Sequence, residues 1–201
     1  MIEGLTYIAD FLEDQEERSL RSQLDQLTYY HDTFRGRQLK RSYAQFGYGY
    51  RSTGRKLTPA APFPAFLAEL VEKVLPFSSP DEPVNQCIIA HYPRGAGIGW
   101  HTDAHSFGDC IIGVTVAGEA RLQFRSNGNE TAEYELSLGQ GSLYSMRGPA
   151  RWDHQHRIVP VKADRRSLTL RHARYDLDKQ TAARDKNRGA EKNSNHDTDD
   201  L

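Results

Sequence analysis

The sequence contains few cysteines and no long hydrophobic run. Cys87 and Cys110 are its only cysteines, and both lie in apolar stretches that are typical of buried, reduced thiols rather than of disulfides or metal ligands. No stretch approaches the roughly 18 apolar residues that span a membrane, and the first residues do not form a basic segment followed by an apolar run. We therefore expect a cytoplasmic protein that does not enter a membrane, with a monomer as the default state.

An excess of charge of either sign is also absent. The chain carries 26 Lys and Arg against 27 Asp and Glu, a formal net charge of −1, so no global positive field marks a nucleic-acid partner and any basic surface must be local. Its 201 residues suffice for one domain with its own core. We assign residues 1–175 to this domain. Residues 176–201 are highly charged and nearly devoid of large apolar side chains, and we predict a disordered tail there.

The apolar pattern of the first third predicts helices. Leucines recur at near-helical spacing in residues 11–30, and Pro62 and Pro64 open a second helix over residues 64–75. Between the two, residues 41–64 are rich in Gly, Pro, Arg and Tyr and lack a clean period. We expect this segment to form loops and short strands on the surface.

The pattern then changes to strands. Alternating or short apolar runs occupy residues 85–92, 110–116, 119–125, 133–138, 141–146 and 165–171. Turn sequences such as PRGAG, SNGN, LGQG and RGPA separate them. Helices followed by a series of antiparallel strands indicate an α+β domain whose core is a sandwich or a jelly roll.

Two potential metal ligands stand close together in the sequence WHTD. His101 and Asp103 are two residues apart, and on a strand this spacing directs both side chains to the same face. A third imidazole from a distant strand would complete two histidines and one carboxylate around iron, with positions left open for a co-substrate and O2. His154 and His156 are both candidates for this third ligand. On its own, a His-x-Asp pattern is more often a pair without metal.

Three longer blocks give this pattern a context: residues 88–124, 141–160 and 165–171. Together with GLTYIADFL and QFGYGY nearer the N-terminus, they resemble the AlkB-like Fe(II)- and 2-oxoglutarate-dependent dioxygenases over most of residues 1–171. The resemblance implies an α+β fold with a double-stranded β-helix (jelly roll) core, N-terminal helices and substrate-lid loops. It also implies Fe(II), 2-oxoglutarate as co-substrate, and O2.

The resemblance assigns the catalytic iron ligands to His101, Asp103 and His156. His156 is favoured as the third ligand by a family pattern in which an arginine is followed, a few residues later, by His and Ile before Pro. His154, one pair earlier on the same strand face, is the alternative ligand or a residue that lines the pocket.

The same resemblance assigns residues to 2-oxoglutarate. Arg165 matches the arginine that meets the distal carboxylate, a contact suited to the guanidinium fork, and Arg171 matches one near the metal-chelating end. Their six-residue separation puts both on one strand face, whereas Arg166 points to the opposite face as an ordinary solvated charge. Tyr92 matches a tyrosine whose hydroxyl reaches the co-substrate, and its alternative role is that of a core aromatic residue.

Three positions depart from the family pattern. Ser167 stands where many relatives carry Asn, Ala90 stands where some do, and Arg157 follows the third ligand where Gly is common. We expect Ala90 to affect the affinity for 2-oxoglutarate and Arg157 to alter the rim of the pocket, and none of the three removes a metal ligand.

A basic and aromatic segment precedes these blocks. Its cations and rings are Arg35, Arg37, Lys40, Arg41, Arg51, Arg55 and Lys56, interleaved with Tyr43, Phe46, Tyr48 and Tyr50. Cations for phosphates and rings for stacking are what recognition of a nucleobase needs. We take Arg41, Tyr48, Tyr50 and His105 as candidate substrate contacts, and residues 104–109 resemble the tRNA-directed branch of the family. The alternative is that the tyrosines pack on the core and the cations are solvated.

The sequence therefore predicts an oxygenase that demethylates or hydroxylates alkylated bases in DNA or RNA, tRNA included. In relatives, hydroxylation of an N-methyl group gives a hemiaminal that releases formaldehyde. Two alternatives stay open. The same chemistry could act on a protein side chain or a small molecule, which the near-neutral charge permits, or the jelly roll could be a non-catalytic binding module, against which the intact ligands and arginines argue.

Overall fold

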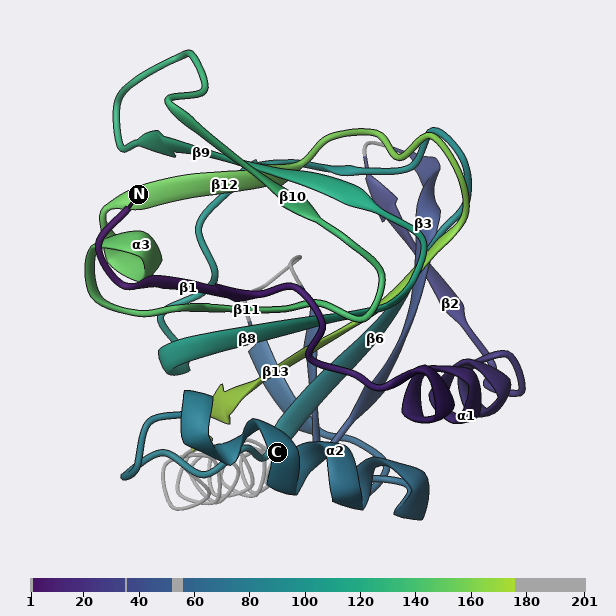
Figure 1. Cartoon of the computed structure of the whole chain (residues 1–201). Helices are drawn as coiled ribbons and strands as arrows, with labels where there is room; N and C mark the ends of the chain where they lie inside the picture. The colour runs from purple at the N-terminus through teal and green to yellow at the C-terminus, as the bar shows by residue number, and fades with distance from the viewer. Residues whose placement is uncertain (1, 35, 52–55, 176–201) are drawn as a thin grey trace, which may run out of the picture.

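Two antiparallel sheets, packed face to face, make up the fold. The structure is a computed structural model that describes residues 2–34, 36–51 and 56–175. The seven-stranded major sheet has the order β1-β11-β8-β13-β6-β3-β2, and the four-stranded minor sheet has the order β10-β9-β12-β7. In Figure 1 the minor sheet forms the upper layer, the major sheet lies beneath it, and helices α1 and α2 lie at the bottom. This arrangement confirms the predicted jelly roll.

The strands of both sheets have these bounds. The major sheet contains β1 (Leu5–Ile8), β2 (Tyr30–Phe34), β3 (Arg37–Phe46), β6 (Gln86–Tyr92), β8 (Phe107–Ala117), β11 (Leu143–Met146) and β13 (Arg165–Ala173). The minor sheet contains β7 (Ile98–His101), β9 (Ala120–Ser126), β10 (Tyr134–Leu138) and β12 (His154–Ile158). The strands β4 (Tyr48–Arg51) and β5 (Lys56–Pro59) form a separate hairpin.

Strand β13 shows how the sequence pattern produces two cores. Successive side chains on a strand point to opposite faces. Leu168 and Leu170 are fully buried on the face that packs against the helices. Arg165 and Arg171 are also buried, on the face directed into the sandwich between the sheets. The major sheet thus carries an apolar layer on one side and charged groups inside the jelly roll on the other.

The helices are shorter than the sequence pattern predicts. Helix α1 covers Asp14–Leu24, begins with a capping box between Glu13 and Glu16, and is followed by β2 from Tyr30. The second segment is a run of short turns of helix: η1 (Ala65–Leu67), α2 (Ala68–Val74) and η2 (Leu75–Phe77). Among the described residues, no helix is long and apolar enough to cross a membrane.

The prediction of loops and short strands on the surface over residues 41–64 is right for the short strands β4 and β5 but wrong for its first part. Residues 42–46 pair with β6 inside the major sheet, and Ser42 and Ala44 are buried there. The inward residues are small, so the alternation is not visible as an apolar period. The RGPA sequence, expected as a turn, opens the short helix α3 (Gly148–Trp152).

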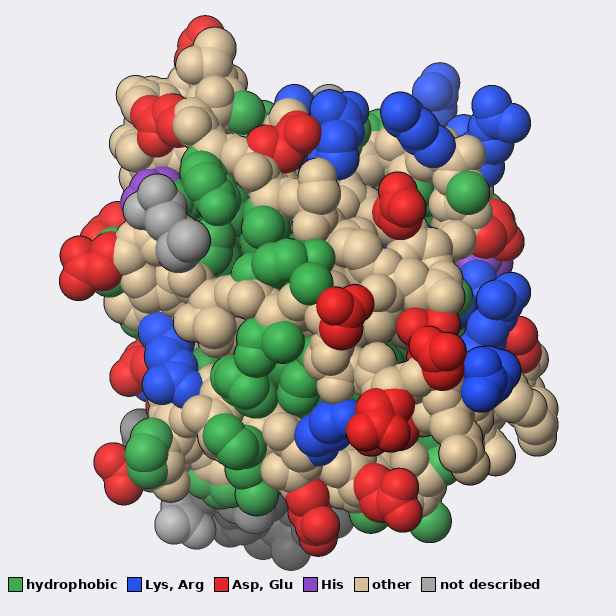
Figure 2. Space-filling model, viewed as in Figure 1, with side chains coloured by type: hydrophobic (Ala, Val, Ile, Leu, Met, Phe, Trp, Pro, Cys, Tyr) green, Lys and Arg blue, Asp and Glu red, His purple; other side chains and the backbone are tan. Residues whose placement is uncertain are grey.

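The face shown in Figure 2 carries side chains of both charges around a group of hydrophobic side chains near its centre. One group of Lys and Arg side chains stands at the upper right, on the side where β2 and β3 lie in Figure 1. The predicted tail at 176–201, together with Arg35 and Arg55, lies outside the described residues.

Packing of the helical layer can be tested with two leucines. Leu67 in η1 is fully buried under the major sheet, whereas Leu75 in η2 is 48% exposed. We expect Leu67→Ala to lower the free energy of unfolding by about 2–5 kcal/mol, because it leaves a cavity. Leu75→Ala should stay within about 0.5 kcal/mol of the wild type. Urea unfolding followed by circular dichroism measures both, and equal effects would contradict this account of the core.

Candidate metal centre

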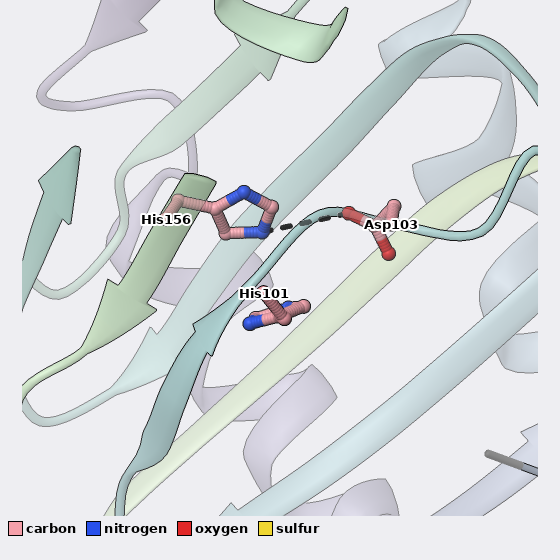
Figure 3. Close-up of side chains that lie close together, drawn as sticks. All are labelled: His101, Asp103 and His156. Carbon is pink, nitrogen blue, oxygen red and sulfur yellow. Dashed lines mark ion pairs between the residues drawn. The ribbon is translucent and has the colours of Figure 1, made fainter. Parts of the chain in front are cut away.

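Three side chains converge inside the jelly roll, as Figure 3 shows: His101, Asp103 and His156. Strands β7 and β12 pair so that His101 stands directly opposite His156, and their ring centroids are 4.3 Å apart. Each of the three residues offers one ligand atom, and these atoms all lie within 4.8 Å of one another. That spacing suits simultaneous contact with one metal ion.

Asp103 does not share a strand with His101, contrary to the prediction from their spacing. Strand β7 ends at His101, and Asp103 lies in the loop that leads to β8. Its carboxylate is 3.5 Å from His156 Nε2 and accepts a hydrogen bond from Arg171 Nη1 at 2.6 Å. The loop, rather than the alternation of a strand, turns the carboxylate toward the two imidazoles.

Charge and burial hold these groups in the states that bind a metal. Burial raises the pKa of Asp103, but the charges of Arg171, His156 and His101 outweigh it and hold that pKa at about 2. Burial, together with the neighbouring His101, lowers the pKa of His156 to about 3. Near neutral pH the centre therefore presents a carboxylate anion and, at His156, a neutral imidazole, which are the protonation states that metal ligands require.

Position, rather than hydrogen bonding, separates the candidate ligands, because His101 and His154 make the same kind of backbone contact. His101 Nδ1 lies 2.9 Å from the carbonyl oxygen of Gly99, so that a proton on Nδ1 leaves Nε2 free for a metal. His154 Nδ1 lies 2.9 Å from the carbonyl oxygen of Pro149 instead. The structure thus groups His156 with His101 and leaves His154 out of the cluster.

A second charged group, Arg165, lies on the same inner face of β13. Its guanidinium is 2% exposed and donates to Ser167 Oγ and Thr115 Oγ1, both at 3.0 Å. Its Cζ is 5.2 Å from the ring centroid of Tyr92, the residue opposite it on β6. Among the described residues no carboxylate forms an ion pair with it. A buried cation that only hydroxyls satisfy fits an anionic ligand such as the distal carboxylate of 2-oxoglutarate.

The other two arginines of this strand differ in their partners. Arg171 is bound on both sides, to Asp103 and, through Nε at 2.6 Å, to Gln86 Oε1. Arg166, on the opposite face as predicted, is not simply solvated, because it pairs with Asp25 at 3.3 Å. Arg171 is therefore part of the metal centre, and Arg166 is part of the helical layer.

The sequence prediction missed Tyr144, which is buried beside Arg165. Gly113 on the neighbouring strand leaves room for its ring, since a Cβ at Gly113 would lie 2.1 Å from Tyr144 Cε1. Burial raises the pKa of Tyr144 well above its ordinary value, against the opposing effect of Arg165. A phenol that stays protonated can donate to a carboxylate bound by Arg165. The only signal was the pairing of the large Tyr144 with the small Gly113, and this pairing can be recognised only when the register of the two strands is known.

Arg151 was also missed as a separate functional residue. It is 1% exposed, and it donates to the carbonyl oxygens of Asp103 at 3.0 Å and Ala104 at 2.9 Å. Its guanidinium also stacks on Trp152, with Cζ 4.0 Å from the ring centroid. The loop around Asp103 does not pair with a strand. The hydrogen bonds from Arg151 therefore hold its backbone in place, as pairing within a sheet would do.

The four candidate substrate residues do not form one cluster. Arg41 lies near Tyr92, at 6.0 Å from its ring centroid. Tyr48 packs on Tyr175 at 4.9 Å, and Tyr50 packs on Phe107 at 5.1 Å. His105 is exposed and stacks on Trp152 at 5.2 Å, with the rings 17° apart. Tyr50 is linked to the metal centre through Phe107, because Arg171 Cζ lies 3.5 Å from the centroid of the Phe107 ring.

Fold and centre together define a class of protein. A jelly roll that holds two histidines and a carboxylate inside, near a buried arginine, is a non-haem Fe(II) oxygenase. The model of the 2OG-Fe(II) oxygenase superfamily matches residues 4–179, and the chain belongs to this superfamily. It is therefore a 2-oxoglutarate-dependent dioxygenase that uses Fe(II), 2-oxoglutarate and O2.

Individual relatives are more distant. An Arabidopsis thaliana protein named "Alkylated DNA repair protein ALKBH8 homolog" is 27% identical over 86% of this chain, and the chain spans 59% of its length. The solved structure of OsALKBH1 superposes with a TM-score of 0.66 at 15% identity, covering 86% of this chain and 98% of that one. A Pseudomonas putida prolyl-4-hydroxylase gives a TM-score of 0.58, also at 15% identity, covering 85% and 93%. These structures share the fold.

The role of Arg151 can be tested by a substitution that keeps its charge. Arg151→Lys retains a cation but loses the fork that holds the Asp103 loop. We expect its affinity for Mn(II), followed by electron paramagnetic resonance, to fall roughly 10–100-fold, the cost typical of losing a partner behind a metal ligand. Arg147→Lys is the matched control, because Arg147 also flanks α3 but donates to Ser78 O at 2.8 Å. Unchanged Mn(II) affinity in a folded Arg151→Lys protein would refute this role.

Proposed function

We propose that this oxygenase oxidises alkyl groups on the bases of nucleic acids, DNA or RNA, including tRNA. The observation that carries the proposal is the cluster of His101, Asp103 and His156 beside Arg165, a buried arginine that forms no ion pair with a carboxylate among the described residues. The names of two of the compared proteins support the proposal: one is called an alkylated DNA repair protein, and OsALKBH1 carries a related name.

In this proposal His101, Asp103 and His156 hold Fe(II). Two neutral imidazoles and one carboxylate leave open positions on the metal for small ligands. Arg171 holds the Asp103 carboxylate from one side, and Arg151 holds its backbone from the other. These contacts fix the ligand before the metal arrives, so that little ordering is needed on binding.

Arg165 binds the distal carboxylate of 2-oxoglutarate, with Tyr92 beside it. The hydroxyls of Ser167 and Thr115 orient the guanidinium by accepting hydrogen bonds from its two Nη atoms. Its Nε is buried and has no hydrogen-bond partner among the described residues, so it is free to donate to the co-substrate. Arg171 stands at the other end of β13, next to Asp103 and so near the chelating end of the co-substrate. The two arginines of one strand face thereby orient one small molecule along the interior.

When bound together, Fe(II), 2-oxoglutarate and O2 supply oxidation of a C–H bond, coupled to decarboxylation of 2-oxoglutarate to succinate and CO2. The protein orients the substrate toward the metal and excludes water from the site. Phe124, whose ring centroid lies 6.1 Å from that of His156, and the fully buried Leu122 close the inner side of the centre. If the oxidised group is an N-methyl group, the resulting hemiaminal releases formaldehyde.

The β2–β3 hairpin provides a basic surface for a nucleic acid. Strand β3 pairs with β6 only from Ser42 onward, so its first residues, including Arg37 and Lys40, are exposed. This is the side on which Figure 2 shows a group of Lys and Arg side chains. Arg41 continues the same strand toward Tyr92, while Tyr50 and His105 lie nearer the metal centre. Local basic charge with aromatic rings is what base recognition uses.

Binding of 2-oxoglutarate is tested by two neighbouring substitutions. Arg165→Lys loses the bidentate contact with the distal carboxylate. We expect its KM for 2-oxoglutarate to rise roughly 10–100-fold, since hydrogen bonds to charged groups contribute about 1.5–3 kcal/mol. Arg166→Lys changes the next residue on the opposite face, which pairs with Asp25, and should leave this KM unaltered. Equal KM values for Arg165→Lys and wild type would remove Arg165 from the co-substrate site.

The substrate class is tested by product analysis. Succinate and formaldehyde are measured with Fe(II), ascorbate and 2-oxoglutarate in the presence of N-methylated tRNA, N-methylated single-stranded DNA, or the unmethylated forms. We expect one methylated nucleic acid to stimulate succinate formation, with formaldehyde in equal amount, and His101→Ala to abolish both products. Stimulation by a peptide or metabolite and by no nucleic acid would instead assign the chemistry to another substrate class.

A further inference from the structure

The outer face of the minor sheet carries a second arrangement of cations and an aromatic ring. Leu122, Phe124, His156 and Ile158 point into the interior, so the alternation of β9 and β12 turns Arg125 and Arg157 outward. The prediction that Arg157 alters the rim of the pocket is therefore wrong. Both lie over the ring of Trp100 on β7, with Cζ at 4.5 Å and 4.6 Å from its centroid. We call Trp100, Arg125 and Arg157 the arginine platform. Figure 1 shows β9 and β12 as the uppermost layer, with no element above them.

Neutral groups hold both guanidiniums in place. Arg125 donates to Gln155 Oε1 at 2.8 and 2.6 Å and to the Glu130 carbonyl oxygen at 2.9 Å. Arg157 donates to Gln123 Oε1 at 2.7 Å. Within the described part of the chain, neither arginine forms an ion pair with a carboxylate. The platform therefore keeps two positive charges.

One carboxylate on the outer face of this sheet, that of Glu135, is already occupied. Glu135 on β10 accepts from Arg121 at 3.3 Å and from Gln123 at 2.5 Å. The same sheet face thus contains one neutralised arginine, Arg121, and two that are fixed without neutralisation. Two like charges beside one ring repel each other, and an anion placed between them would relieve that repulsion.

We propose that the arginine platform binds the phosphate backbone of a single-stranded nucleic acid. Guanidiniums that are already oriented lose little entropy when they bind a phosphate, and their planar forks match its oxygens. An aromatic ring among cations is the usual composition of surfaces that bind single strands. This inference rests on the proposed function, because it concerns how the same kind of substrate is held.

The position of the platform relative to the metal centre supports this reading. Trp100 directly precedes His101, and Arg157 directly follows His156. The two strands that hold the histidines inside therefore present the platform outside. A strand bound there lies against the sheet of the iron centre, on a face different from the β2–β3 hairpin, so that nucleotides flanking the reactive base have a second anchor.

The test compares arginines on one sheet face. The double variant Arg125→Gln/Arg157→Gln is matched with Arg121→Gln, which removes a neutralised cation. Binding of a short fluorescein-labelled single-stranded RNA, and of the corresponding DNA, is followed by anisotropy at several salt concentrations. We expect the double variant to bind more weakly, with a slope of log K against log salt that is shallower by about 0.7 for each lost contact. Arg121→Gln should keep the wild-type slope.

Further outcomes separate this inference from the proposed function. Succinate formation without nucleic acid should be the same in all three proteins, which verifies the fold and the iron centre. If the wild type binds the oligonucleotides and the double variant keeps its affinity and slope, the platform is not a nucleic-acid site and the proposed function stands. If the wild type binds no nucleic acid, both fail. Loss of binding to poly-glutamate alone, with nucleic-acid binding intact, would assign the platform to an acidic protein and overturn the inference.

Discussion

The ion pair between Asp103 and Arg171 is the interaction on which the interior of this protein depends. It joins the loop that follows β7 of the minor sheet to β13, the central strand of the major sheet, in the interior between the two sheets. Removing a charge from water is costly unless a partner compensates it, and among the described residues neither Asp103 nor Arg171 has another ion-pair partner of comparable closeness. Two imidazoles and a second buried arginine surround the pair, so the interior is organised by charges rather than by close apolar packing alone.

Much of this architecture could be predicted from residue patterns. The strands over 85–92, 110–116 and 165–171 were visible as apolar runs, and the blocks that resemble AlkB-like enzymes identified the family. The failures share a cause, because each depends on partners far apart in sequence. Small inward residues such as Ala44 hide a buried strand, Asp103 is turned by bonds from Arg151, and Tyr144 is placed by a glycine on a neighbouring strand.

The comparisons show how little of the substrate choice lies in the fold. OsALKBH1 and a bacterial prolyl-4-hydroxylase superpose on this chain at the same 15% identity. The fold alone therefore does not identify a substrate, which must be argued from the residues of the site and its surroundings. In this chain the surroundings are the β2–β3 and β4–β5 hairpins, the loop that carries His105, and the outer face of the minor sheet.

The site residues and the two hairpins occupy different parts of the chain. The candidate metal ligands and the two interior arginines all lie between residues 101 and 171, whereas the two hairpins lie between residues 30 and 59. The hairpins meet this machinery through a few contacts, such as those of Tyr50 with Phe107 and of Arg41 with Tyr92, and through the pairing of β3 with β6. A change in the exposed part of the hairpins can therefore alter what the protein binds while the ligands and the interior arginines keep their places.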